Sequence, residues 1–140
     1  MNKMIETMKK AFPEYVIMFG KGTFYNVYGR DCSIMNYLFG YKIKEVGKDT
    51  TCGFPKNSLN KVRVTLEKKG INYIVIDRTH NYEEEDKYET KDNKYEEVYG
   101  TACKYISLKK RLDDVSKYCL SNLENVKVLE IINFNPLLSS

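Results

Sequence analysis

The sequence predicts an α+β domain in which helices flank a mixed β-sheet. Segments whose apolar residues recur at helical spacing alternate along the chain with apolar runs rich in β-forming residues. Some predicted strands follow one another through a glycine turn, as in hairpins, whereas others are separated by a helix, so both antiparallel and parallel neighbours are expected. A length of 140 residues fits a single domain, residues 1–140, with its own hydrophobic core.

The chain begins with a predicted helix and a predicted β-hairpin. Apolar residues at helical spacing place the helix over residues 2–12, and Pro13 ends it because proline disfavours the α conformation of the residue before it. The apolar run at 15–19 predicts a buried strand. A glycine turn then connects this strand to a partner strand at 23–28.

Two further helices and three strands are predicted before residue 78. Asp31 is a suitable N-cap for a helix that buries Ile34, Met35 and Leu38 and ends at Gly40. The other predicted elements are strands at 41–45, 50–54 and 71–77 and a helix, capped by Asn57 or Ser58, that ends before Gly70.

The last part of the chain predicts a loop, a strand, a helix and a strand. Residues 80–94 are polar and dense in charge, and predict an acidic, flexible loop. Residues 95–140 add an edge strand at 95–99, a helix capped by Ser107, and a strand at 126–132 before a frayed tail. We expect the apolar stripe of that helix to be buried; it comprises Leu108, Leu112, Val115, Cys119, Leu120 and Leu123.

The net charge of +4 conceals an uneven distribution. Residues 83–97 carry eight acidic residues against three lysines, a local charge of −5, so the rest of the chain carries +9. A basic body with one acidic excursion is compatible with a nucleic-acid partner, but a solvated basic surface is also common. Twelve tyrosines and six phenylalanines could serve as core residues or stack on bases.

The residue types present exclude several kinds of site and location. No apolar run approaches the ~20 residues of a membrane helix, and the N-terminus lacks the apolar core of a signal peptide, so we expect a cytoplasmic protein without membrane contact. The cysteines Cys32, Cys52, Cys103 and Cys119 form no Cys-x-x-Cys pair, and His80 is the one histidine of the sequence. We therefore expect no metal, no cofactor and no enzymatic activity.

One predicted strand carries an unusual alternation of aromatic and polar residues. Because residues two apart in a strand share a face, Phe24, Asn26 and Tyr28 point one way, and Tyr25 and Val27 point the other. One of these faces should be the core. The alternation therefore leaves Phe24 and Asn26 as a candidate exposed pair, an aromatic ring beside a hydrogen-bonding amide.

An ordered series of short motifs connects this chain to a known family. The series is Phe12-Pro13-Glu14-Tyr15-Val16-Ile17-Met18-Phe19, Gly22-Thr23-Phe24-Tyr25-Asn26, Cys52-Gly53-Phe54-Pro55, Ser58, and Leu66-Glu67-Lys68-Lys69-Gly70 before an apolar strand. In order and spacing it resembles the N-terminal mismatch-recognition domain, domain I, of the DNA mismatch-repair protein MutS. The resemblance covers about residues 10–78, and residues 80–140 match it poorly. No ATPase, clamp or lever region accompanies it.

The resemblance implies a DNA-binding site. In the MutS family the phenylalanine of a Phe-x-Glu element wedges into the DNA stack from the minor groove at a mismatch, and the glutamate hydrogen-bonds the displaced base. Phe24 matches the phenylalanine, whereas Asn26 occupies the glutamate position and Thr23 the position that is usually aspartate. Asn26 can both donate and accept a hydrogen bond but carries no carboxylate.

The sequence thus predicts a stand-alone, non-catalytic DNA-binding domain whose partner is double-stranded DNA, mismatched or kinked. Phe24 is the expected wedge, and Asn26 the expected contact to a base edge or the DNA backbone. The candidate phosphate contacts are Lys21, Arg30, Lys42, Lys56 and Lys61. The alternative is a protein-interaction module that keeps the fold, has lost DNA binding with the glutamate, and docks a protein through the acidic loop or an aromatic face.

Overall fold

The computed structural model describes residues 3–79 and 82–121. The chain divides into two compact units, residues 1–104 and 105–140. All the described strands lie in the first unit, which also contains three complete helices and the start of a fourth.

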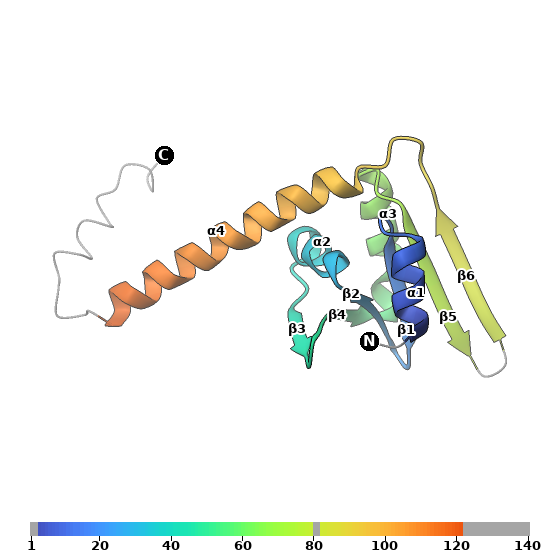
Figure 1. The fold of residues 1–140 in the computed structure, drawn as a ribbon, viewed down its shortest axis with the longest axis horizontal. Helices are drawn as coiled ribbons and strands as arrows, with labels where there is room; N and C mark the ends of the chain where they lie inside the picture. The colour runs from blue at the N-terminus through green and yellow to red at the C-terminus, as the bar shows by residue number, and fades with distance from the viewer. Residues whose placement is uncertain (1–2, 80–81, 122–140) are drawn as a thin grey trace. The chain divides into compact units, whose positions relative to one another are not determined.

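The first unit is built on a six-stranded sheet with the strand order β3-β4-β2-β1-β5-β6. Its strands are β1 (Val16–Lys21), β2 (Phe24–Tyr28), β3 (Ile43–Val46), β4 (Asp49–Pro55), β5 (Tyr73–Thr79) and β6 (Tyr82–Tyr88). The neighbouring strands β1 and β5 run parallel, and the other neighbours are antiparallel. The predicted mixed sheet is therefore confirmed (Figure 1).

Four α-helices accompany the sheet in the described part of the chain. They are α1 (Lys3–Ala11), α2 (Arg30–Phe39), α3 (Leu59–Lys68), which follows the short 3-10 helix Lys56–Ser58, and α4 (Tyr95–Ser121). The helices predicted at 2–12 and after Asn57 or Ser58 are found with small shifts at their ends. As expected for a helix stopped by glycine, Gly40 takes the left-handed conformation, with φ 74°, directly after α2.

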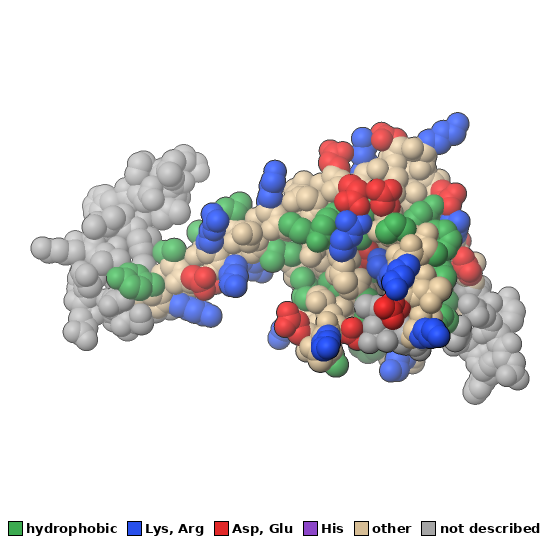
Figure 2. Space-filling view, viewed as in Figure 1, with side chains coloured by type: hydrophobic (Ala, Val, Ile, Leu, Met, Phe, Trp, Pro, Cys, Tyr) green, Lys and Arg blue, Asp and Glu red, His purple; other side chains and the backbone are tan. Residues whose placement is uncertain are grey.

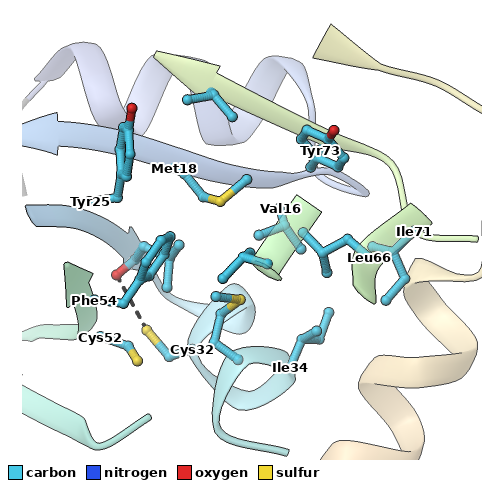
Figure 3. Packing of buried hydrophobic residues seen from close by; sticks show 14 of the residues in the cluster. Val16, Met18, Tyr25, Cys32, Ile34, Cys52, Phe54, Leu66, Ile71 and Tyr73 are labelled. Atoms are coloured by element: carbon cyan, nitrogen blue, oxygen red, sulfur yellow. Dashed lines mark hydrogen bonds between the residues drawn. The ribbon is translucent and has the colours of Figure 1, made fainter. Parts of the chain in front are cut away.

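Two hydrophobic clusters lie on opposite faces of the sheet. On one face, Val16 and Met18 of β1 and Tyr25 and Val27 of β2 are buried together with residues of α2, α3 and the start of α4. Figure 3 shows Val16, Met18, Tyr25 and Phe54 of the sheet facing Cys32 and Ile34 of α2 and Leu66 of α3. On the other face, α1 packs on Ile17 and Phe19 of β1 and on Ile74 and Ile76 of β5, and Tyr28 of β2 packs against the same cluster.

The cap predicted for α2 is wrong, because Asp31 serves the tertiary structure instead. Gly29 precedes the helix with φ 65°, and the Asp31 side chain, inside the first turn, is fully buried. Its carboxylate accepts hydrogen bonds from the backbone N–H of Ile17 (3.0 Å) and the Tyr95 hydroxyl (2.6 Å), and pairs with Lys9 (Nζ–Oδ2 2.5 Å). One carboxylate thus joins α1, β1, α2 and α4.

The loop predicted at 80–94 is largely the edge strand β6. Its charged residues pair with β5 in register from Arg78↔Glu83 to Ile74↔Lys87, and the Tyr88 ring stacks on Tyr73 with the ring centroids 5.4 Å apart. Charged side chains are common on edge strands because they discourage pairing with another chain. A polar composition therefore marked an exposed strand rather than a loop.

The edge strand predicted at 95–99 is the first turn and a half of α4, which begins well before Ser107. Asn93 caps this helix, since its Oδ1 accepts the backbone N–H of Tyr95 (3.2 Å), and Glu96 and Glu97 occupy the first turn. In the second unit, Leu108, Leu112 and Val115 are exposed, so their predicted burial is wrong for the described residues. The predicted strand at 126–132 and the predicted tail lie outside the described residues.

Candidate nucleic-acid interface

The β1–β2 hairpin presents Phe24 at the surface of the first unit. Lys21 and Phe24 face each other across the hairpin, and Gly22 supplies the positive φ (61°) that the tight turn between them requires. The Phe24 ring is 47% exposed, whereas the next residue, Tyr25, is buried on the opposite face. The strand alternation therefore brings an aromatic ring to solvent at the start of β2, as predicted, whereas Asn26 of the predicted exposed pair is half-buried.

A groove runs along β2 and β4 on the same face of the sheet as α1, beside the strands β1 and β5 on which that helix packs. Cross-strand partners share a face, so Phe24 lies with Pro55, Asn26 with Gly53 and Tyr28 with Thr51 on this side. The groove has a volume of about 630 Å³ and is lined by Lys21, Phe24, Asn26, Lys42, Lys44, Thr51 and Gly53. We call it the β2–β4 groove.

Asn26 lies on the floor of the β2–β4 groove because its cross-strand partner is glycine. A Cβ atom at position 53 would stand 2.8 Å from Asn26 Oδ1, closer than real contacts allow. The motif Cys52-Gly53-Phe54-Pro55 therefore has a structural reason at its second position. Cys52 and Phe54 point into the core, and Gly53 leaves room for the amide.

The lining of the β2–β4 groove is basic. Lys21, Lys42 and Lys44 contribute three ammonium groups, and no acidic residue lines the groove in the described part of the chain. Asp49 lines a neighbouring hollow on the α1 side, which shares Lys21, Asn26 and Thr51 with the groove. A concave surface with one sign of charge concentrates an anionic ligand.

Lys56 lies on the other side of Phe24 and is held by protein contacts. Its Nζ donates to Asp77 Oδ1 (2.9 Å) and lies 5.3 Å from the centre of the Tyr25 ring, while its backbone N–H donates to the Thr23 carbonyl (2.9 Å). The Tyr25 hydroxyl donates to the same Asp77 (3.0 Å). Lys56 therefore ties the hairpin turn beside Phe24 to β5.

The remaining two predicted contacts lie away from the groove. Arg30 and Lys61 belong to α2 and α3, which cover the opposite face of the sheet. The Arg30 guanidinium pairs with Glu96 (2.5 Å), which raises the pKa of Arg30, and it lies over the rings of Tyr95 and Tyr99. The structure thus brings together Phe24, Asn26, Lys21 and Lys42, with Lys56 at the edge, but not Arg30 or Lys61.

Sequence reasoning did not select Lys44, Thr51 or Gly53, which complete the groove. The signal was available in the two predicted strands that follow the second helix. Lys42 and Lys44 are two residues apart in the strand predicted at 41–45, and Thr51 and Gly53 are two apart in the strand predicted at 50–54. Residues two apart in a strand share a face. What the sequence did not reveal is that β4 pairs with β2 in the register that places Gly53 opposite Asn26.

Two of the cysteines in the described residues are buried and unreactive. Burial raises the pKa of the Cys32 thiol to about 12 and that of the Cys52 thiol to about 11, so both remain protonated at neutral pH. Both are small core residues, whereas Cys103 is exposed. Within the described ranges no three His, Cys, Asp or Glu side chains gather as metal ligands, and none of the helices is both long enough and apolar enough to cross a membrane.

Comparison with known families gives a match that covers most of the chain. The family model of MutS domain I matches residues 1–111. The chain belongs to the MutS domain I family. The match is longer than the likeness visible at residues 10–78 and includes β6 and residues 95–111 of α4. No curated protein matches the chain. Domain I of MutS is a recognition domain without a catalytic role, which agrees with the prediction that this chain is not an enzyme.

Proposed function

We propose that this chain binds double-stranded DNA through the β2–β4 groove without catalysing a reaction on it. The observation that carries the proposal is a half-exposed phenylalanine at the start of a strand, beside a groove lined by three lysines and no carboxylate among the described residues. Membership of the MutS domain I family supports the same partner. In this arrangement Lys21, Lys42 and Lys44 contact phosphates, and Asn26 contacts base edges.

Phe24 acts as a wedge at a base step that kinks easily. Inserting an apolar side chain between base pairs costs a few kcal/mol of stacking, and the bent DNA recovers this by covering more protein surface. A mismatch lowers the cost of unstacking, and so does a flexible step. Lys56, bound to Asp77, holds the turn that carries the wedge and need not contact a phosphate itself.

The substitution Phe24→Ala tests this function. Because the ring is 47% exposed, the free energy of unfolding should change by about 1 kcal/mol or less. Affinity for a mismatched or kinked duplex should fall, while the salt-dependent, sequence-independent binding by the lysines remains. Val64→Ala on α3 is the matched control, since Val64 is 51% exposed and lies on a helix that covers the other face of the sheet.

Fluorescence anisotropy over a range of salt concentrations provides the measurement. Wild type should lose affinity steeply as salt rises, and Lys44→Gln should reduce the slope of log K against log salt by about 1. If wild type binds no duplex even at low salt, where phosphate contacts are strongest, the proposal fails.

The protein-interaction module is the second candidate, and one observation favours it. Leu108, Leu112 and Val115 on the second half of α4 are all more than half exposed. Lys109 and Arg111 lie among them, and Figure 2 shows hydrophobic and basic side chains together on this helix. The partner that fits is an amphipathic helix with carboxylates beside its apolar stripe. Weakened partner binding by Leu112→Lys, with DNA binding unchanged, would identify this surface.

A further inference from the structure

The polar groups that line the β2–β4 groove share one property, which is that each can donate a hydrogen bond. Lys21, Lys42 and Lys44 are donors only, whereas the Asn26 amide and the Thr51 hydroxyl both donate and accept. No side chain that can only accept a hydrogen bond lines the groove in the described residues. The carboxylate of Asp49 lines the neighbouring hollow beside α1.

The Asn26 amide is available for a ligand. It is half-buried beside Gly53, and neither it nor the Thr51 hydroxyl hydrogen-bonds to another group of the described chain. Gly53 fixes where the amide lies, because any larger residue there would displace it. Two unused polar groups on neighbouring strands therefore face the groove between the lysines.

This donor pattern is complementary to the minor groove of paired DNA. There, A·T and T·A pairs offer only the acceptors adenine N3 and thymine O2, and G·C adds the guanine N2 amino donor. Proteins that insert apolar wedges work from this groove and read it with Lys, Arg, Asn and Gln. We propose that the β2–β4 groove binds the minor groove of fully paired, A·T-rich duplex, with Asn26 as the residue that sets this preference. The inference rests on the proposed function and deepens it.

Two physical effects add to the preference for A·T-rich sequence. A·T-rich segments have a narrow minor groove with an enhanced negative potential, which attracts the lysine side chains. Steps of thymine followed by adenine unstack easily, so a Phe24 wedge enters them at low cost without any mismatch. A carboxylate at position 26 would weaken the preference, because it cannot donate to the base acceptors and would be repelled by the same negative potential.

The experiment compares four duplexes of equal length that differ only at the centre. The centres are an A·T segment with a thymine–adenine step, the same segment with one mismatch, a G·C segment, and an inosine·cytosine segment. Inosine lacks the amino group in the minor groove but keeps the major-groove edge of guanine. Wild type should bind the A·T and inosine·cytosine duplexes about tenfold tighter than the G·C duplex, and the mismatched duplex no more than about threefold tighter than the A·T duplex.

Asn26→Glu and Asn26→Gln form a matched pair of variants. They have the same shape, but only glutamine keeps the amide. Asn26→Gln should retain the order of affinities to within about threefold, whereas Asn26→Glu should lose at least tenfold for the paired A·T duplex and retain relatively more for the mismatched one.

Three results would overturn the inference alone while leaving DNA binding intact. These are equal affinity for the A·T and G·C duplexes, an inosine·cytosine duplex that behaves like G·C, or a mismatch preference above tenfold in wild type. Absence of binding to all four duplexes at low salt would overturn the proposed function as well. The A·T preference and DNA binding itself are therefore tested by different results.

Discussion

At the scale of single residues, the buried ion pair of Lys9 and Asp31 makes stability depend on pH. Burial raises the pKa of Asp31 above its ordinary value, and the ammonium of Lys9 (2.5 Å) and the Tyr95 hydroxyl oppose this rise. Because the folded chain holds this proton more tightly than the unfolded chain, the contribution of Asp31 to stability falls as the pH rises through its folded-state pKa.

Lys9→Met removes the largest influence that lowers the pKa of Asp31. The variant should lose about 3–5 kcal/mol of stability at neutral pH, where a buried carboxylate is left without its partner. The loss should shrink on acidification, because a protonated Asp31 needs no cation. Urea unfolding at several pH values measures this. The double variant Lys9→Met with Asp31→Asn is the control, and a penalty that stays constant with pH in Lys9→Met alone would contradict the account.

Gly53→Ala tests the floor of the β2–β4 groove without touching the hydrophobic core. The added Cβ would lie 2.8 Å from Asn26 Oδ1, so the amide must move, and DNA affinity should fall by about tenfold. Stability should change by less than about 1 kcal/mol, since the displaced atom is the end of a half-buried side chain.

Gly100→Ala is the matched control. Position 100 is an exposed helical site with open space, so that variant should gain about 0.5–1 kcal/mol. Anisotropy titrations measure the DNA affinity of both variants, and urea titrations measure their stability. Unchanged DNA binding by Gly53→Ala would count against the role of Asn26.

At the scale of elements, β6 should prove necessary although its composition suggests a dispensable loop. Tyr88 stacks on Tyr73, and the Tyr73 hydroxyl accepts from Arg63, which also pairs with Asp86. Tyr88→Ala should therefore cost about 1–2 kcal/mol through lost stacking and burial. Lys91→Ala, an exposed residue just after the strand, should cost almost nothing. Equal midpoints of unfolding for Tyr88→Ala and Lys91→Ala would show that the contacts of β6 do not stabilise the fold.

The elements that the sequence predicted well are those with strong local signals. The apolar run of β1 between Pro13 and Gly20 and the run of β5 after Gly70 left little choice of structure. The misassigned elements depend on contacts distant in sequence. Asn93 followed by Glu96 is a capping pattern that could have placed the start of α4. The local sequence around Tyr95 predicts a strand, because it does not reveal the hydrogen bond of Tyr95 to Asp31, 64 residues away.

The candidate site shows the same division between local and distant signals. Alternation within β2 predicted that Phe24 and Asn26 share a face, and both line the groove. The choice among cations could not be made locally. Lys56 and Arg30 are bound by Asp77 and Glu96, and these partners lie 21 and 66 residues away. Only the tertiary structure shows which ammonium groups remain available for phosphate.

At the scale of the whole molecule, the family match and the division of the chain agree on where the recognition fold ends. The match stops at residue 111, and the first compact unit ends at residue 104. The last buried side chains among the described residues of α4 are Tyr95 and Ala102, and beyond Ile106 every described side chain on this helix is exposed. The fold of the first unit should therefore require the start of α4 but not its second half.

Two truncated chains test this boundary. A chain that ends at Arg111 keeps Tyr95, Ala102 and the pairing of Arg30 with Glu96, so its midpoint of thermal unfolding should stay close to that of the full chain. A chain that ends at Lys94 loses all three, and it leaves the Asp31 carboxylate without the Tyr95 hydroxyl in a fully buried position. Loss of a hydrogen bond to a buried charge together with a buried tyrosine costs several kcal/mol, a large part of the stability of a domain of this size. The shorter chain should therefore unfold or aggregate.

Tyr95→Phe in the full chain separates the loss of the hydrogen bond from the loss of the buried ring, since it removes only the hydroxyl and should cost about 1.5–3 kcal/mol. A chain ending at Lys94 that unfolds cooperatively at the wild-type temperature would show that α4 is not part of the recognition fold.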